Sequence, residues 1–290
     1  MRLEATLCFL SSGMSFRLLS VFFRISKASI SKFIPEVCDA ISEALDEYFQ
    51  VSKRCCGAID GKHVVIQAPP NCGSEYYNYK GTNSLVLLAI VDHDYCFKYV
   101  DIGSYGRNSD GGVFQASSLY PVLENSTLLP EGGIVVGDDA FPLKTYLLKR
   151  YPNETTTAEK TYNYRFSRAR RIVENGFGIL ASRFRVLGKP IQLQEETTIK
   201  IIRTTCVLHN WLRKSSPHIY TPPGSVDYED ITNFTVNLGT WRSEINALPS
   251  IARSRTNNRS KAVAEKLREK YKNYFCNDGA VSWQSRMINI

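Results

Sequence analysis

The stretch GAIDGKHVVIQAPP, residues 57–70, decides the fold, because it is a strand-like apolar run that carries one acid, Asp60. A second apolar run, IVVGDDAFPL at residues 134–143, places Asp138 directly after its glycine in the same manner. Strand ends are where α/β proteins expose reactive side chains to a crevice, so we expect Asp60 and Asp138 at strand ends rather than inside strands. Adjacent side chains of an extended segment point to opposite faces, so only one of Asp138 and Asp139 can face that crevice.

Two further acids accompany this pair. Asp110 lies in the Gly-rich turn GRNSDGGVF, residues 106–114, at the expected start of a helix, where a turn or N-cap role would suffice to explain it alone. Glu174 is the only acid in the helical stretch SRARRIVENGFGILASRFRVL, residues 167–187. It either pairs with Arg170 at i,i+4 spacing or points into a shared site while nearby arginines bind phosphates.

Several carboxylates that converge without a counterion repel one another and raise one another's pKa. A hard divalent cation resolves this repulsion, because Mg²⁺ or Mn²⁺ binds carboxylate oxygens and keeps water molecules for the substrate. Two such ions about 3.5–4 Å apart can activate an attacking oxygen and stabilise a leaving oxygen in phosphodiester cleavage. The acids, taken together, therefore indicate a metal site with a basic rim that holds DNA.

The composition is that of a globular protein of 290 residues, with 43% hydrophobic and 22% charged residues. The 36 Lys and Arg residues exceed the 28 Asp and Glu residues, and the net charge of +8 is consistent with a polyanionic partner. The eight cysteines form no CxxC pair and lie mostly in apolar runs, which indicates a reducing compartment without a structural zinc. No apolar run is long enough for a membrane span, and we expect no membrane partner.

Three regions differ in their patterns. Residues 1–50 have helical periodicity, residues 51–215 mix strands and helices in an α/β layout, and residues 216–290 combine a Pro/Ser-rich linker with a basic amphipathic helix. We expect that last helix to be a surface helix within a flexible tail. The polar basic stretch at 253–261 is a weak candidate for nuclear import.

The N-terminal region has the pattern of a helix-turn-helix. Ser15 and Ser26 are candidate N-caps of two short helices joined by a tight turn, and Lys27 and Lys32 begin the second helix, where they could contact DNA. A plain helical hairpin packed on the main domain is the alternative.

Six ordered blocks between residues 54 and 214 resemble the Harbinger transposase-derived nucleases of the PIF/Harbinger group of DDE transposases. These blocks are GAIDGKHV, YYNYKG, GRNSDGGVF, GDDAFPL, NYRFSRARRIVENGFGILASRFRVL and CVLHNWLR. The resemblance implies an RNase H-like mixed sheet flanked by helices, with the N-terminal helical segment and the C-terminal tail outside it. Relative to the family, the chain begins inside the helix-turn-helix region and is short between residues 46 and 60.

The resemblance also implies roles for individual positions. Asp60, Asp138 and Glu174 match the catalytic acids, which also bind metal, and Asp110 matches a further metal-binding acid. Lys62, Arg165 and Arg168 resemble substrate-side or support positions of the family. We expect these three side chains and Arg171, a further arginine near Glu174, to contact DNA. A Myb-like DNA-binding partner and a nuclear location follow from the same resemblance, with the cytoplasm as the alternative and the oligomeric state open.

The predicted function is therefore a divalent-metal-dependent DNA endonuclease or transposase-like enzyme. The rival hypothesis is a domesticated DNA- or protein-binding factor that keeps the fold without cleaving. His209 and Asn210 lie on an apolar helix, where a core histidine with satisfied hydrogen bonds is a better expectation than a metal ligand.

Overall fold

The computed structural model describes residues 1–49, 57–70, 72–108, 110–125, 127–243, 248–251 and 262–288. The side chains of Phe49 and Asp110 and the basic stretch at 253–261 lie outside this described part. The backbone of Asp110 begins helix α4, as the sequence predicts, whereas its role toward metal stays a prediction.

A five-stranded mixed sheet forms the centre of the molecule, in the order β3-β2-β1-β4-β5. Strands β1 (Gly57–Val65), β2 (Ser84–Val91) and β3 (Phe97–Tyr105) form an antiparallel meander, and a tight turn at residues 92–94 joins β2 to β3. The short strands β4 (Val135–Val136) and β5 (Leu147–Leu148) run parallel to β1. This mixed sheet with helices on both faces is the predicted RNase H-like architecture.

Alternation along β1 separates two apolar cores. Ala58 and Val64 belong to the larger core, which contains residues of the long helices α6 (Thr157–Arg183) and α7 (Glu195–Ser215). Ile59 belongs to the smaller core, with residues of α4 (Asp110–Ala116) and α5 (Leu119–Glu124). Even-numbered β1 side chains therefore face α6, and this assignment positions the candidate site.

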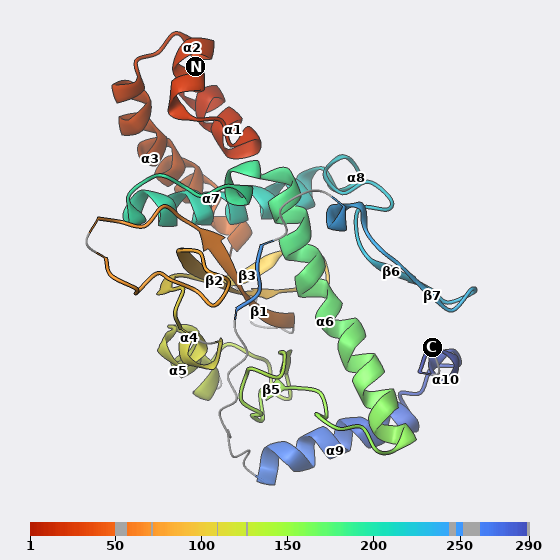
Figure 1. The fold of residues 1–290 in the computed structure, drawn as a ribbon. Helices are drawn as coiled ribbons and strands as arrows, with labels where there is room; N and C mark the ends of the chain where they lie inside the picture. The colour runs from red at the N-terminus through yellow and green to blue at the C-terminus, as the bar shows by residue number, and fades with distance from the viewer. Residues whose placement is uncertain are drawn as a thin grey trace.

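The N-terminal helices pack on the outer side of α7, as Figure 1 shows in red and brown. They are α1 (Arg2–Ser12), α2 (Phe16–Phe23) and α3 (Lys27–Ala44), followed by the short 3₁₀ helix η1 (Asp46–Phe49). Ser15 and Ser26 cap α2 and α3 as predicted, since their hydroxyls accept hydrogen bonds from the backbone N–H groups of Leu18 and Ser29. Ile30 and Ile34 join the larger core, so these helices are part of the main body.

Helix α6 begins ten residues before the stretch recognised in the sequence, at a capping box in which Thr156 and Glu159 satisfy each other's backbone N–H groups. Its apolar side chains Val173, Phe177 and Leu180 are buried. The 3₁₀ helix η2 (Arg185–Gly188) joins α6 to the segment that leads to α7.

The segment expected to be a linker is instead packed against α6. It comprises α8 (Pro217–Tyr220), the hairpin strands β6 (Tyr228–Asp230) and β7 (Thr235–Asn237), and η3 (Thr240–Arg242). Residues 248–251 then run beside β1, where Ser250 forms an antiparallel bridge with Lys62. This difference arises because Tyr220, Asp227 and Trp241 are buried by tertiary contacts that local composition does not encode.

The C-terminal helices α9 (Ala262–Cys276) and α10 (Gln284–Met287) lie beside the first half of α6 (Figure 1). Ala264 is buried in a third apolar cluster with Tyr162 and Phe166 of α6, so α9 differs from the expected surface helix on a flexible tail. Within the described ranges no helix has both the length and the apolarity needed to cross a membrane.

Candidate active site

Asp60 lies in the middle of β1, so the expectation that it ends a strand is wrong. Gly61 does not break the strand, because it pairs in register with Leu88 of the neighbouring strand β2. The Asp60 side chain is 5% exposed; its Oδ1 accepts a hydrogen bond from the backbone N–H of Gly61 at 3.0 Å, and its Oδ2 lies 2.8 Å from Nζ of Lys62. Lys62 is two residues along the same strand face, which explains how it reaches the carboxylate.

Asp138 follows β4 by two residues, as predicted for a strand-end acid. β1 and β4 pair in parallel with Ala58 opposite Val136, and extending this register by two residues brings Asp138 opposite Asp60. Gly137 supports the extension, because a Cβ added there would lie 3.0 Å from Cγ2 of Ile59. By alternation from Val136, Asp138 faces the same side of the sheet as Asp60, toward α6.

Asp139 points elsewhere, as the alternation predicts. Its Oδ2 lies 3.4 Å from Nε of Arg150, a residue beyond β5. Asp138 is half-buried, and its Oδ1 accepts a hydrogen bond from the backbone N–H of Ala140 at 2.9 Å. The two adjacent acids thus have separate environments.

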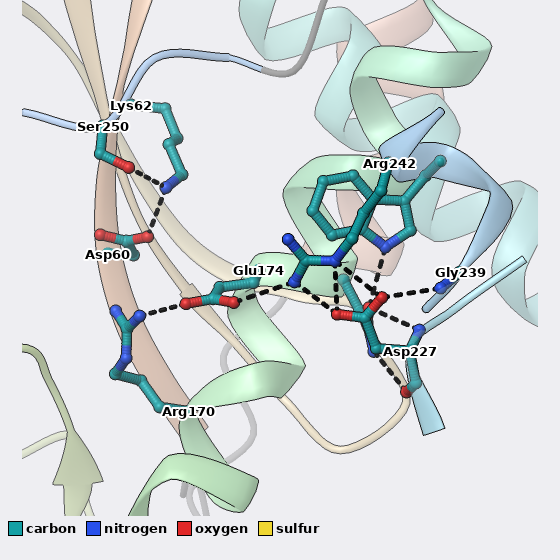
Figure 2. A network of polar contacts seen from close by, with 10 residues as sticks. Asp60, Lys62, Arg170, Glu174, Asp227, Gly239, Arg242 and Ser250 are labelled. Atoms are coloured by element: carbon teal, nitrogen blue, oxygen red, sulfur yellow. Dashed lines mark hydrogen bonds and ion pairs between the residues drawn. The ribbon is translucent and has the colours of Figure 1, made fainter. Parts of the chain in front are cut away.

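Glu174 lies on the face of α6 that packs against β1. The ammonium group of Lys62, which contacts Asp60, lies 5.8 Å from the ring centroid of Phe177, one helical turn after Glu174. Figure 2 shows the Asp60–Lys62 pair and Glu174 facing the same space between the sheet and α6. Asp60 and Glu174 therefore lie on the same side of the sheet, and the extended register predicts the same side for Asp138.

Glu174 also has the ion pair that a purely structural interpretation predicts. Arg170 contacts Glu174 Oε1 from one turn earlier, and Nη2 of Arg242 lies 3.4 Å from Oε2 on the other side. Asp60 and Glu174 are thus each paired with cationic side chains of the same chain.

The donor set fits a hard divalent cation, since every predicted ligand is a carboxylate oxygen. Asp60, Asp138 and Glu174 are not drawn into a tight cluster, however. Among the residues that the structure describes, the one group of three His, Cys, Asp or Glu side chains with ligand atoms within 4.8 Å of one another is Asp92, His93 and Asp94.

That turn is a poor alternative site for the metal. The buried Asp92 carboxylate already accepts hydrogen bonds from the backbone N–H groups of Asp94 and Cys96, and its Oδ2 lies 3.1 Å from Nζ of Lys98. Its acceptors are engaged in closing the β2–β3 turn. We therefore assign the metal-binding prediction to the α6 side of the sheet.

Comparison with known proteins shows the family of the chain. A family model described as DDE superfamily endonuclease matches residues 59–210, which include Asp60, Asp138 and Glu174. The chain belongs to the DDE endonuclease superfamily.

Its relatives place it among the Harbinger transposase-derived nucleases of that superfamily. The rat (Rattus norvegicus) protein named "Putative nuclease HARBI1" is 30% identical over 241 residues, which cover 76% of this chain and 68% of the relative. The human (Homo sapiens) protein of the same name is 29% identical over 241 residues, with the same coverage. "Protein ALP1-like" of Arabidopsis thaliana is 28% identical over 240 residues, which cover 72% of this chain and 59% of the relative. No solved structure matches this member of the superfamily.

The basic residues predicted to bind DNA occupy three different environments. Lys27 and Lys32 are exposed at the start of α3, whereas Lys62 is 8% exposed and belongs to the Asp60 site. Arg165, Arg168 and Arg171 line a groove of about 570 Å³ on α6.

These three arginines have partners within the chain. Arg165 donates a hydrogen bond to the backbone oxygen of Gly279 at 3.0 Å. Arg168 and Arg171 both contact Glu229, whose side chain is 2% exposed, at 3.4 and 3.0 Å. DNA contact by any of these basic residues stays a prediction.

His209 and Asn210 are core residues, as predicted. His209 Nδ1 lies 2.9 Å from the Tyr220 hydroxyl, and its Nε2 lies 2.8 Å from the backbone oxygen of Tyr95. Burial lowers the pKa of His209 to about 4, so the ring is neutral at physiological pH. Asn210 accepts from the backbone N–H of Phe97 and donates to its oxygen, tying α7 to β3.

Sequence reasoning missed the contribution of the segment after α7. Ser250 accepts a hydrogen bond from Lys62 Nζ at 2.7 Å, and Arg242 reaches Glu174 from η3. Asp227 holds Arg242 in turn. Local sequence gives no signal for these positions, because the surrounding residues are polar, Pro-rich and without periodicity.

Proposed function

We propose that this chain is a divalent-metal-dependent endonuclease that cleaves phosphodiester bonds in DNA. The observation that supports the proposal is the parallel pairing of β1 and β4, because its register, extended by two residues, predicts Asp138 opposite Asp60 on the sheet face that α6 covers. Membership of the DDE endonuclease superfamily and relatives named as nucleases support the same chemistry.

In this proposal Asp60, Asp138 and Glu174 hold Mg²⁺ or Mn²⁺, and Asp110 assists from the start of α4. When bound, the ions would lower the pKa of the attacking water and stabilise the negative charge that develops on the departing 3′ oxygen. The chain's own residues fix the acids: Lys62 and Ser250 hold the Asp60 carboxylate in place, and Arg170 orients Glu174 from one turn earlier.

The DNA duplex is the proposed substrate because the chain combines this acidic site with a net charge of +8. Lys27 and Lys32, exposed at the start of α3, are proposed to contact the phosphate backbone. We further propose action in the nucleus, alongside a Myb-like DNA-binding partner.

The test is nicking of supercoiled plasmid in Mn²⁺ or Mg²⁺ by the wild type, Asp138→Asn and Asp139→Asn. Loss of an outer partner of a metal ligand costs 10–100-fold, so loss of a ligand itself should reduce nicking by roughly 100-fold or more in Asp138→Asn. Asp139→Asn is the matched control, because the adjacent carboxylate pairs with Arg150. Equal nicking by the wild type and Asp138→Asn would reject the assignment.

A DNA-binding factor that does not cleave is the second candidate. It is favoured by the ion pairs at Asp60 and Glu174, which stabilise the fold whether or not a metal binds. The Arabidopsis relative has a name that states no nuclease activity. Tight DNA binding by the wild type, without nicking in either metal, would select this candidate.

A further inference from the structure

The segment after α7 is fixed to α6 at Asn175, next to Glu174. The buried amide of Asn175 accepts hydrogen bonds from the backbone N–H of Asp227 and from Nε1 of Trp241, both at 3.0 Å, and donates to the backbone oxygen of Asp227 at 3.1 Å. Trp241 lies against Gly178, where an added Cβ would come within 2.2 Å of its ring. Helix α6 thus fixes η3 in place beside Glu174.

Asp227 converts this anchoring into a fixed position for one guanidinium. Its side chain is 1% exposed, and a carboxylate buried to that degree needs a cationic partner. Arg242 is that partner, since its Nε lies 2.9 Å from both carboxylate oxygens and its Nη2 contacts Oδ2. The backbone N–H of Gly239 donates a further hydrogen bond to Asp227 Oδ1 at 2.8 Å.

Arg242 still presents part of its guanidinium to the candidate active site. The side chain is 36% exposed, its Cζ lies 4.3 Å from the Trp241 ring centroid, and Nη2 reaches Glu174 Oε2 at 3.4 Å (Figure 2). Stacking on the ring and bonding to Asp227 together restrict both the plane and the position of the guanidinium. A guanidinium that is held in advance loses less entropy when it binds an oxyanion.

We propose that Arg242 is a substrate-binding residue that contacts a phosphate of the DNA backbone beside Glu174, with Asp227 and Asn175 as its positioning residues. A planar guanidinium suits phosphate oxygens because it offers two parallel N–H donors. The contact to Glu174 is long for an ion pair, whereas those to Asp227 are short. When Glu174 binds a metal ion, Arg242 therefore stays in place and is free to bind phosphate on its Glu174 side.

This inference rests on the proposed function, and it adds a residue from outside the stretch that the family model matches, residues 59–210. It also gives a reason why the segment after α7 packs against α6 and is not the linker that its composition predicts. A structural role alone would be complete with the Asp227–Arg242 pair.

The test is the affinity of the full chain for fluorescein-labelled duplex DNA, measured by fluorescence anisotropy in Ca²⁺ across a series of KCl concentrations. Anisotropy reads binding whether or not the DNA is nicked. Arg242→Gln should weaken binding by about tenfold or more, and the slope of log K against log salt should fall in magnitude by about 0.9, because one phosphate contact is lost. Arg203→Gln is the control, since Arg203 is an arginine of α7 whose side chain is 51% exposed and whose Nη2 lies 3.5 Å from Asp46 Oδ1.

The slope of log K against log salt separates a phosphate contact from a structural role. A variant that is only less stable keeps the wild-type slope, because its folded molecules still make the same phosphate contacts. Arg242→Gln leaves the buried Asp227 carboxylate without its cationic partner, which can unfold the protein. The double variant Asp227→Asn/Arg242→Gln removes both charges and should show the same reduced salt slope. A wild-type slope and affinity in whichever variant is folded would overturn the role of Arg242.

The outcomes also separate this inference from the proposed function. Wild-type protein that binds but never nicks DNA rejects the nuclease, and the salt slope still decides the role of Arg242. Nicking by the wild type with an unchanged slope in the Arg242 variants overturns the inference alone. Wild-type protein that does not bind DNA overturns both.

Discussion

Replacing Lys62 with Met removes the cation next to Asp60 while keeping most of the side chain's volume. In the structure the Lys62 and Asp60 side chains are 10% and 5% exposed and 2.8 Å apart, so Asp60 would be left buried without its partner. Removing one member of a buried ion pair costs about 3–5 kcal/mol. For a chain of this size that corresponds to a melting temperature lower by roughly 6–20 °C in EDTA.

The same variant reports on metal binding. If Asp60 binds a divalent ion, Mn²⁺ replaces the missing positive charge, and a ligand that binds only the folded state raises stability with its concentration. The difference in melting temperature between Lys62→Met and the wild type should therefore narrow as Mn²⁺ is added. Thermal unfolding followed by circular dichroism in EDTA and in a Mn²⁺ series measures both effects.

Lys98→Met is the matched control, because Lys98 and Asp92 form a second largely buried ion pair with side chains 14% and 10% exposed. Its loss of stability should be similar, but Mn²⁺ should not restore it. The reasoning fails if Lys62→Met melts with the wild type in EDTA, or if Mn²⁺ leaves the gap unchanged. Recovery of Lys98→Met alone would place the ion at the β2–β3 turn.

Three further predictions concern the framework. Gly178→Ala places a methyl group within 2.2 Å of the Trp241 ring and should lower the free energy of unfolding by about 1–3 kcal/mol, measured by urea denaturation. Ser26→Ala removes the N-cap of α3 and should cost about 1 kcal/mol in the same assay, without changing nicking. His209 has a pKa of about 4 in the folded protein against 6.5 in the unfolded chain, so only the unfolded chain takes up a proton between these values. Stability should fall as the pH drops through this window, by at most about 3 kcal/mol, and His209→Gln should show a shallower fall.

Much of the fold could be predicted from the chain because local physics decides it. The apolar run of β1, the serine caps of α2 and α3, and the start of α4 at Asp110 each depend on residues a few positions apart. The position of Asp60 could not be predicted in the same way. Gly61 signals a break in isolation, whereas pairing with Leu88 carries the strand through it.

The candidate site divides along the same line. The residue types at 60, 138 and 174 and their resemblance to a nuclease family were available from the chain. The pairing of β1 with β4, extended by two residues, then predicts that the first two acids lie opposite each other. Of the two cationic partners of Glu174, Arg170 could be predicted from helical spacing. Arg242 could not, because it lies 68 residues further along the chain and no local pattern indicates the contact.

The amino-acid sequence by itself indicated the mixed strand-and-helix character of residues 51–215, the helix caps and the identity of the acids, because these depend on near neighbours. Only the tertiary structure decided that residues 217–251 fold back onto α6 and bring Asp227, Arg242 and Ser250 to the site. The physical reason is that burying Trp241 and pairing a buried carboxylate are contacts between distant parts of the chain, and such contacts leave no periodic trace in the order of residues.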